Sequence, residues 1–201
     1  MLPLLCAGVV AVVLFLAAQQ TAPPTATAGE RIALPAPDKE GGKPLMQALS
    51  LRKSERSFSS DALSEQEISN LLWAAWGVNR PDGRRTVPTA NNRQRVEVYA
   101  AKADGVWRYD GPSHSLEKVL ERDALPSFGG APLTLIYAVE DNADTYGSMH
   151  VGSIYQNVGL YCASADLAGV VKASGASDAQ KKLPLPAGYK VLIVQSVGRP
   201  D

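Results

Sequence analysis

Three cations and two hydroxyls gather in one short segment of the chain, Arg52-Lys53-Ser54-Glu55-Arg56-Ser57-Phe58. A guanidinium group offers paired N–H donors to a phosphate, and an ammonium adds a point charge. Such a segment is poor core material and well suited to binding an anion. A solvated helix end is the plainer interpretation of a lone basic cluster, because residues 45–51 just before it have the apolar spacing of a helix.

A second polar segment, residues 77–95, contains five arginines together with Pro, Gly and Asn residues that favour turns. Polar loops of this length are often functional. Its arginines are either solubility charges or, together with backbone N–H groups aimed by the turns, further donors to an anion.

The composition narrows the classes of function. The chain has 201 residues, and its 20 basic and 20 acidic residues give a net charge of zero, which argues against a nucleic-acid-binding domain. His114 and His150 are far apart in the sequence and no cluster of Cys and His exists, so we expect no metal site. Cys162 lies in an apolar helical pattern typical of a core residue. The sequence has no Ser/His/Asp or Cys/His arrangement, and we expect no catalytic side chain.

The first 28 residues are predicted to lie outside the folded domain. Residues 2–18 form an almost unbroken apolar run without a charge, and Ala26-Thr27-Ala28 offers small residues for cleavage before Gly29. The segment is therefore either a signal peptide or an N-terminal membrane anchor. We expect the protein in the periplasm or outside the cell, free or attached through residues 2–18. Residues 29–44, rich in Pro and Gly, are predicted to be a linker or an extended arm.

Residues 45–201 are predicted to form a single α+β domain, with helices packed around a mainly antiparallel central sheet. After the helix at 45–51, a second helix begins at a capping box formed by Ser64 and Glu67 and ends at Gly77. Further helices are predicted at Ser115–Arg122 and at Met149–Leu167. The predicted strands are 96–100, 105–109, 132–139 and 189–198.

Five motifs, met in this order along residues 45–200, resemble those of the FMN-dependent nitroreductase family. The likeness is greatest to a branch of short dehydrogenases related to those that oxidise azolines in peptide toxin biosynthesis. The motifs are R-R-S-x-R-x-F at 52–58, L-L-W-A-A-x-G-x-N at 71–79, R-T-x-P-S-A-x-N-x-Q at 85–94, Q-N-x-x-L at 156–160 and V-G-x-P at 197–200.

The resemblance implies FMN as the cofactor and names the residues that would hold it. The FMN phosphate and the polar edge of its ring would be held by Arg52, Lys53, Ser54 and Arg56. A cation near that edge stabilises the reduced flavin. The loop under the ring and the ribityl chain would be formed by Pro88, Thr89, Ala90 and Asn92. The family's G-L-G turn, whose backbone amides approach the flavin, appears here as Asp166-Leu167-Ala168-Gly169, in which Leu167, Ala168 and Gly169 would bind the cofactor. Arg199 is the candidate for the family's last basic residue.

The resemblance also implies an obligate homodimer with FMN in a crevice between the subunits and the helix at 150–167 as the dimer core. The reaction would pass a hydride through flavin N5 to a small organic acceptor or from a peptide or azoline donor. Tyr146 and His150 either line the substrate side or simply pack within their helix. A second hypothesis is a non-catalytic exported protein that holds a flavin or another small anion on the same fold. The altered turn, in which Asp166 adds a negative charge, favours it.

Overall fold

The computed structural model describes residues 29–121, 131–141 and 145–201. The predicted signal peptide or anchor at residues 1–28 lies outside the described residues. In the part of the chain that is described, no helix is both long enough and apolar enough to cross a membrane.

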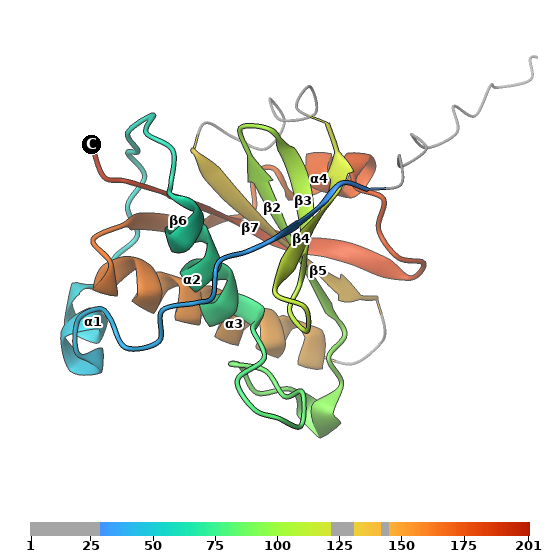
Figure 1. The fold of residues 1–201 in the computed structure, drawn as a ribbon. Coiled ribbons are helices and arrows are strands. Elements are labelled where there is room, and N and C mark those ends of the chain that lie inside the picture. Colours follow the sequence, from blue (N-terminus) through green and yellow to red (C-terminus); the bar gives the residue numbers. More distant parts are fainter. Residues whose placement is uncertain (1–28, 122–130, 142–144) are drawn as a thin grey trace, which may run out of the picture.

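A seven-stranded sheet forms the framework of the domain, in the order β1-β4-β3-β2-β5-β7-β6 (Figure 1). Each strand pairs with its neighbours in the antiparallel sense. The strands are β1 (Arg31–Ala33), β2 (Val96–Lys102), β3 (Gly105–Asp110), β4 (Ser115–Leu120), β5 (Leu133–Glu140), β6 (Ala168–Lys172) and β7 (Tyr189–Gly198). The predicted α+β architecture is therefore confirmed.

The helices cover both faces of this sheet. They are α1 (Leu45–Leu51), α2 (Glu65–Trp76), α3 (Tyr146–Ser164) and α4 (Ala176–Lys182), with a single 3₁₀ turn, η1, at Ala90–Asn92. Helices α2 and α3 share the larger hydrophobic cluster with one face of the sheet, whereas α4 packs with the opposite face. Helix α1 contacts α3 at the edge of the molecule.

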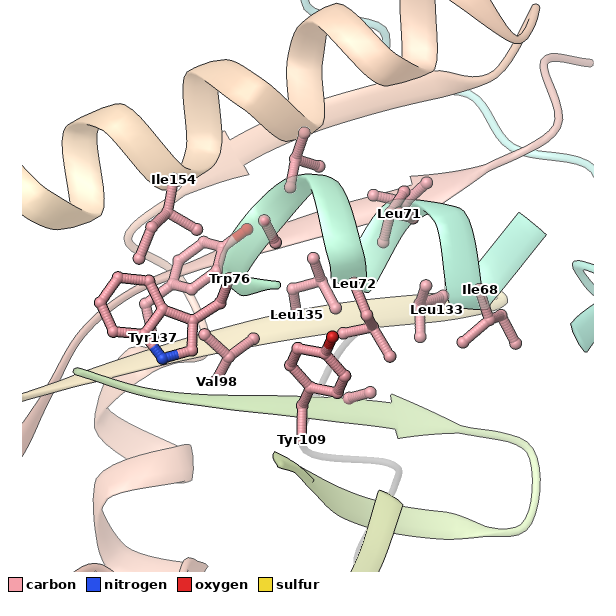
Figure 2. Packing of buried hydrophobic residues seen from close by; sticks show 14 of the residues in the cluster. Ile68, Leu71, Leu72, Trp76, Val98, Tyr109, Leu133, Leu135, Tyr137 and Ile154 are labelled. Carbon is pink, nitrogen blue, oxygen red and sulfur yellow. The ribbon is translucent and has the colours of Figure 1, made fainter. Parts of the chain in front are cut away.

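Helix α2 is the centre of the larger core (Figure 2). Leu71 and Leu72 of α2 are fully buried against Leu135 of β5 and Ile154 of α3. Strand β5, apolar on both faces, is buried along seven of its eight residues, as its near-continuous apolar sequence predicts.

The ends of α2 follow the predicted signals. The Ser64 hydroxyl accepts a hydrogen bond from the Glu67 N–H at 3.2 Å, and the Glu67 carboxylate accepts one from the Ser64 N–H at 2.7 Å, which completes the capping box. The Gly77 N–H donates to the Trp73 carbonyl at 2.8 Å, and a Cβ at Gly77 would lie 2.3 Å from Trp73 Cδ1. Glycine is needed here for space.

The helix predicted at Ser115–Arg122 is wrong, because residues 115–120 form strand β4 between β3 and β1. The Glu117 carboxylate contacts the guanidinium groups of Arg108 on β3 and Arg31 on β1. These pairs across the strands, together with the fully buried Leu116, outweigh the helical preference of the local sequence.

Helix α3 begins at Tyr146 and ends at Ser164, three residues earlier at each end than predicted. Asp166 adopts a left-handed conformation (φ 55°), and the Leu167 N–H donates to the Cys162 carbonyl at 2.8 Å. This is a Schellman-type stop, in which the left-handed residue turns the chain out of the helix. Strand β6 starts directly afterwards, at Ala168.

Residues 29–44 lie along the domain and contain β1, which pairs with β4. The Asp38 N–H donates to the Asn70 side chain of α2 at 2.8 Å, and the Lys43 N–H donates to the Ser164 hydroxyl of α3 at 2.7 Å. The segment is therefore held at several points before α1 begins.

Candidate functional site

The basic segment at 52–58 is fixed between α1, α3 and β6. The Glu55 N–H donates to the Gly169 carbonyl at 3.0 Å, which ties the segment to the start of β6. A Cβ placed on Gly159 of α3 would lie 3.7 Å from Cγ of Arg52, so the arginine stem packs over that glycine. Two parts of the chain that the family motifs single out, the basic segment and residues 167–169, thus lie side by side.

The charged groups of this segment remain exposed to solvent. Arg52, Lys53, Ser54 and Arg56 are all exposed. The Lys53 ammonium lies 2.8 Å from the Glu55 carboxylate and, by its hydrogen bond and its charge, lowers the pKa of that carboxyl. Three cations against one carboxylate leave the surface positive, as an anion site requires.

A cavity of about 230 Å³ lies between the basic segment, the C-terminal half of α3 and the start of β6. Its walls combine one cation and two carboxylates with apolar surface: Leu51, Lys53, Glu55, Gly159, Cys162, Ala163, Asp166, Leu167, Ala168, Gly169 and Pro200. Burial raises the pKa of the Cys162 thiol to about 12, so it is an apolar part of the wall and not a nucleophile.

The carboxylate of Asp166 at this cavity is paired. The Lys43 ammonium lies 2.6 Å from it and also donates to the Ser164 carbonyl at 3.3 Å. Lys43 therefore compensates the negative charge that Asp166 brings to the cavity. Sequence reasoning missed Lys43, because it belongs to the arm before α1 and no local pattern connects it to the end of α3.

The predicted flavin loop, residues 88–92, lies elsewhere on the chain. Pro88 and Asn92 are exposed, while Thr89 and Ala90 are half-buried. The Ala90 N–H donates to Nε2 of His150 on α3 at 2.8 Å. Because the helix rises 1.5 Å per residue, the His150 and Gly159 positions are about 14 Å apart along α3. In Figure 1, α1 and the 77–95 loop accordingly lie near opposite ends of α3.

Arg199 does not line the cavity. Its guanidinium lies 2.9 Å from the Glu67 carboxylate and so connects the end of β7 to the start of α2. Partial burial acts to raise the pKa of Glu67, but the N–H and hydroxyl of Ser64 and the Arg199 guanidinium outweigh it and lower that pKa.

Tyr146 and His150 stack on one another at the N-terminal end of α3, with ring centroids 6.5 Å apart and planes 14° apart. His150 is buried and Tyr146 is exposed. The sequence named His150 only as substrate lining or helix packing, whereas the structure gives it a bond to the flavin loop.

Away from the cavity, Ser69 and His114 form a Ser–His contact. Nε2 of His114 lies 2.8 Å from the Ser69 hydroxyl and 3.0 Å from the Pro35 carbonyl, while Nδ1 lies 2.8 Å from the Tyr109 hydroxyl. Ser69 has no exposed surface, so no substrate can reach its hydroxyl. These contacts fasten the N-terminal arm to the domain and are not catalytic.

Across residues 29–121, 131–141 and 145–201, no three His, Cys, Asp or Glu side chains come together as a metal site would require. The basic segment and the cavity beside it are suited to binding a ligand. The segment provides cations and a hydroxyl for an anionic group, and the cavity provides an apolar wall.

The comparisons with known proteins identify the family and the fold. The model of the nitroreductase family matches residues 49–199. "Putative nitroreductase MJ1384" of Methanocaldococcus jannaschii is 30% identical over 196 residues, which cover 85% of this chain and 98% of the relative. A crystal structure of a Ralstonia eutropha JMP134 protein with the same description is 33% identical, covers 89% of this chain and 93% of its own, and superposes with a TM-score of 0.78.

Two more distant structures share the fold. The Escherichia coli microcin synthetase McbBCD complex, with truncated pro-MccB17 bound, matches with a TM-score of 0.66 and 23% identity over 75% of this chain and 70% of that chain. A Desulfovibrio desulfuricans protein in complex with FMN matches with a TM-score of 0.57 and 18% identity over 79% of this chain and 87% of that chain. The family match spans almost the whole described domain and includes the basic segment and residues 88–92, so the chain belongs to the nitroreductase family of oxidoreductases.

Proposed function

We propose that this protein is an FMN-dependent oxidoreductase that works as a homodimer, with each flavin at a seam between the two subunits. One observation carries the proposal: the exposed basic segment is hydrogen-bonded, through Glu55, to Gly169 at the rim of a cavity with an apolar wall. FMN carries a phosphate and an apolar ring system, which match the basic segment and the apolar wall of the cavity respectively.

The donor set fits FMN. The phosphate and the polar edge of the ring would be held by the exposed side chains of Arg52, Lys53, Ser54 and Arg56. Residues 167–169, at the start of β6, would approach the ring from the cavity side, and the loop of Pro88, Thr89, Ala90 and Asn92 would lie under it. The Ala90 N–H is engaged by His150 and the Ala90 carbonyl by the Arg93 N–H, so Ala90 would offer its methyl surface and not a hydrogen bond.

The separation along α3 supports a dimer. The basic segment and the flavin loop are too far apart on one protomer to touch one flavin from both sides. If α3 of two subunits pack antiparallel about a two-fold axis, the basic end of one protomer meets the loop end of its partner. The 230 Å³ cavity, smaller than the roughly 300–1,000 Å³ usual for ligand sites, fits a site that a second subunit completes.

The surface of α3 and α1 supports the same interface. A stripe with the spacing of a helix–helix contact runs along α3 through Tyr146, Met149, Ser153, Gln156, Leu160 and Ala163. Met149 is 61% exposed, and on α1 Leu45 and Met46 are 63% and 75% exposed. Apolar side chains this exposed, on adjacent helices, are typical of a surface that a partner covers.

When bound, the flavin supplies the hydride transfer at its N5. The chain contributes position, the charge of the basic segment and, in the dimer, walls that exclude water. The substrate would be a small organic acceptor, or an azoline-type peptide donor. The peptide alternative is supported by the likeness to the fold of the McbBCD microcin synthetase, whose structure has truncated pro-MccB17 bound.

A non-catalytic flavin- or anion-binding protein is the second candidate. It is favoured by Asp166, whose carboxylate lines the cavity, and by Arg199, whose guanidinium is held by Glu67. The pairing of Asp166 with Lys43 weighs against it, because the charge at the cavity is compensated.

The purified protein tests these candidates. We expect flavin absorbance in the visible range, FMN in the heat-released supernatant and a mass of two chains by light scattering. Reduction of the bound flavin by NAD(P)H or dithionite, followed by reoxidation with a nitroaromatic acceptor, would establish an oxidoreductase. A protein that binds FMN but never turns over would establish the binding module. One that neither carries nor takes up FMN would exclude the enzyme and the flavin-binding module and leave only the binding of another small anion.

The proposed location outside the cytoplasm rests on residues 1–28 of the sequence. The intact mass of the protein from its native cell envelope tests it. A chain that starts at Gly29 would indicate a cleaved signal, a full-length chain in the membrane fraction would indicate an anchor, and a full-length chain in the cytosol would contradict export.

A further inference from the structure

The flavin loop is attached to α3 through one side chain that faces inward. His150 is only 6% exposed, and its Nε2 accepts the Ala90 N–H at 2.8 Å. A ring nitrogen that accepts a hydrogen bond carries no proton, so the imidazole is neutral and its proton is on Nδ1. Tyr146, one turn earlier on α3, stacks on the ring and restrains its orientation.

The loop that this bond holds is conformationally strained. Asn91 and Asn92 both have left-handed backbones, with φ of 51° and 53°, which non-glycine residues adopt at a cost. Local hydrogen bonds close the turn: the Asn92 N–H donates to the Thr89 carbonyl and the Arg93 N–H to the Ala90 carbonyl. Strained turns of this kind persist where the surroundings hold them. The bond to His150 connects the turn to a helix whose inner face is buried.

We propose that His150 is a positioning residue for the flavin: by accepting the Ala90 N–H, it holds residues 88–92 in the shape that lies against the flavin ring. This inference rests on the proposed function. His150 touches the loop and not the cofactor, so it acts through Ala90. The same helix carries Gly159 under Arg52, so α3 holds both the loop and the basic segment of its own subunit. In the proposed antiparallel pair of α3 helices, the loop of one subunit would then meet the basic segment of the other.

The two chemical features of the side chain predict how substitutions behave. His150→Leu keeps an apolar group of similar size in the core and removes the acceptor, which leaves the Ala90 N–H without its partner. His150→Gln keeps an acceptor oxygen near the position of Nε2. A purely structural role of the ring would make both variants similar, whereas positioning through the hydrogen bond makes Gln a replacement for His.

The first measurement is amide exchange at Ala90 in the apoprotein, by NMR. We expect His150→Leu to speed exchange at Ala90 by about three- to tenfold, the range for one net hydrogen bond, and His150→Gln to leave it within about twofold of the parent. His114→Gln, a matched loss of the other histidine, should leave the Ala90 rate unchanged. If Ala90 exchange in His150→Leu equals that of the parent, the proposed restraint does not exist.

The second measurement is binding of FMN and of riboflavin, followed by flavin fluorescence. Because the loop is placed under the ring and not at the phosphate, His150→Leu should weaken both ligands by the same factor, about three- to tenfold, with His150→Gln near the parent. Ala90→Pro removes the same N–H from the loop side, and in the His150→Leu background it should add little. It serves as the second variant if His150→Leu fails to fold.

The possible outcomes distinguish a failure of the proposed role of His150 from a failure of the proposed flavin function. A parent that binds FMN with variants of equal affinity would overturn the role of His150 and leave the flavin function standing. A loss confined to FMN would also overturn it, because it would put His150 at the phosphate end. A parent that binds neither ligand would overturn both proposals, while the Ala90 exchange rates would still report whether His150 restrains the loop.

Discussion

The Lys43 ammonium lies 2.6 Å from the Asp166 carboxylate, at the point where α3 ends and the cavity begins. Asp166 is itself in a left-handed conformation that glycine adopts at lower cost. The chain thus has an acidic residue at a turn where the family motif has glycine, and a cation from the distant N-terminal arm beside it.

We predict that Lys43→Met lowers FMN affinity by up to about fivefold, because the uncompensated Asp166 charge then repels an anionic ligand. The Asp166 side chain is 84% exposed, and exposed pairs of this kind amount to about 0.2–1 kcal/mol. In the Asp166→Asn background the Lys43 substitution should have no further effect. Fluorescence titration with FMN measures both. An equal loss in the two backgrounds would mean that Lys43 contacts the ligand directly.

A larger effect is expected from the basic segment itself. Arg56→Ala should lower FMN affinity by about 1–3 kcal/mol, the range for losing a partner to a charged group, and riboflavin affinity by less. Arg31→Ala provides the matched control, since Arg31 is an exposed arginine on β1 whose partners are Asp110 and Glu117. Titration of each apoprotein with both flavins measures the difference. Retention of FMN by Arg56→Ala at the parent affinity would remove Arg56 from the site.

The fold was predictable where one element's own sequence decides its structure. Strand β7 runs from Tyr189 to Gly198 as its apolar sequence predicts, and α2 begins at the capping box. The errors lie where contacts with residues distant in the sequence determine the secondary structure. Strand β4 was predicted as a helix, and its conformation depends on β3 and β1, which are only recognised once the sheet is assembled. The short elements β1, β6 and α4 carry too little local pattern to be found.

The site residues were likewise predictable where a local motif identifies them, and not where distant contacts do. The motifs named the basic segment and residues 167–169, which lie at the start of β6 and do not form a turn, and the structure brings both to one cavity. Lys43 and the bond between His150 and Ala90 were missed, because each joins residues far apart in the chain through contacts without a sequence signature. The resemblance identified Arg199 as a candidate but could not show what its side chain contacts. The ion pair with Glu67 forms only once the fold brings the end of β7 to the start of α2.

The capping box of α2 should contribute measurably to stability. Ser64→Ala removes the acceptor for the Glu67 N–H, and we expect the free energy of unfolding to fall by about 0.5–2 kcal/mol. Ser60→Ala, a neighbouring exposed serine, should stay within about 0.5 kcal/mol of the parent. Urea unfolding followed by circular dichroism compares the three proteins. Equal midpoints for the parent and Ser64→Ala would indicate that the cap is not needed once α2 is packed.

The His114 contacts predict a pH-dependent stability. Burial lowers the pKa of His114 below its usual 6.5, the bond to the Pro35 carbonyl opposes this shift, and the charge of Lys39 adds to it. Between the folded and unfolded pKa values the unfolded chain binds a proton that the folded chain does not. The free energy of unfolding therefore falls as the pH drops from about 6.5 through the folded pKa, and is fully restored above about 6.5.

Urea unfolding at intervals between pH 5 and pH 7.5 measures this slope, a window chosen because most carboxyl groups titrate below it. His114→Gln should flatten the dependence of the unfolding free energy on pH between pH 5 and 6.5. His150→Gln should keep the portion of that dependence that His114 contributes. The N-terminal arm should loosen first, because the Leu34 N–H donates to the His114 carbonyl and the Pro35 carbonyl contacts the ring. Faster amide exchange at Leu34 in the acid range would report this, and a parent slope unchanged by His114→Gln would show that another group is responsible.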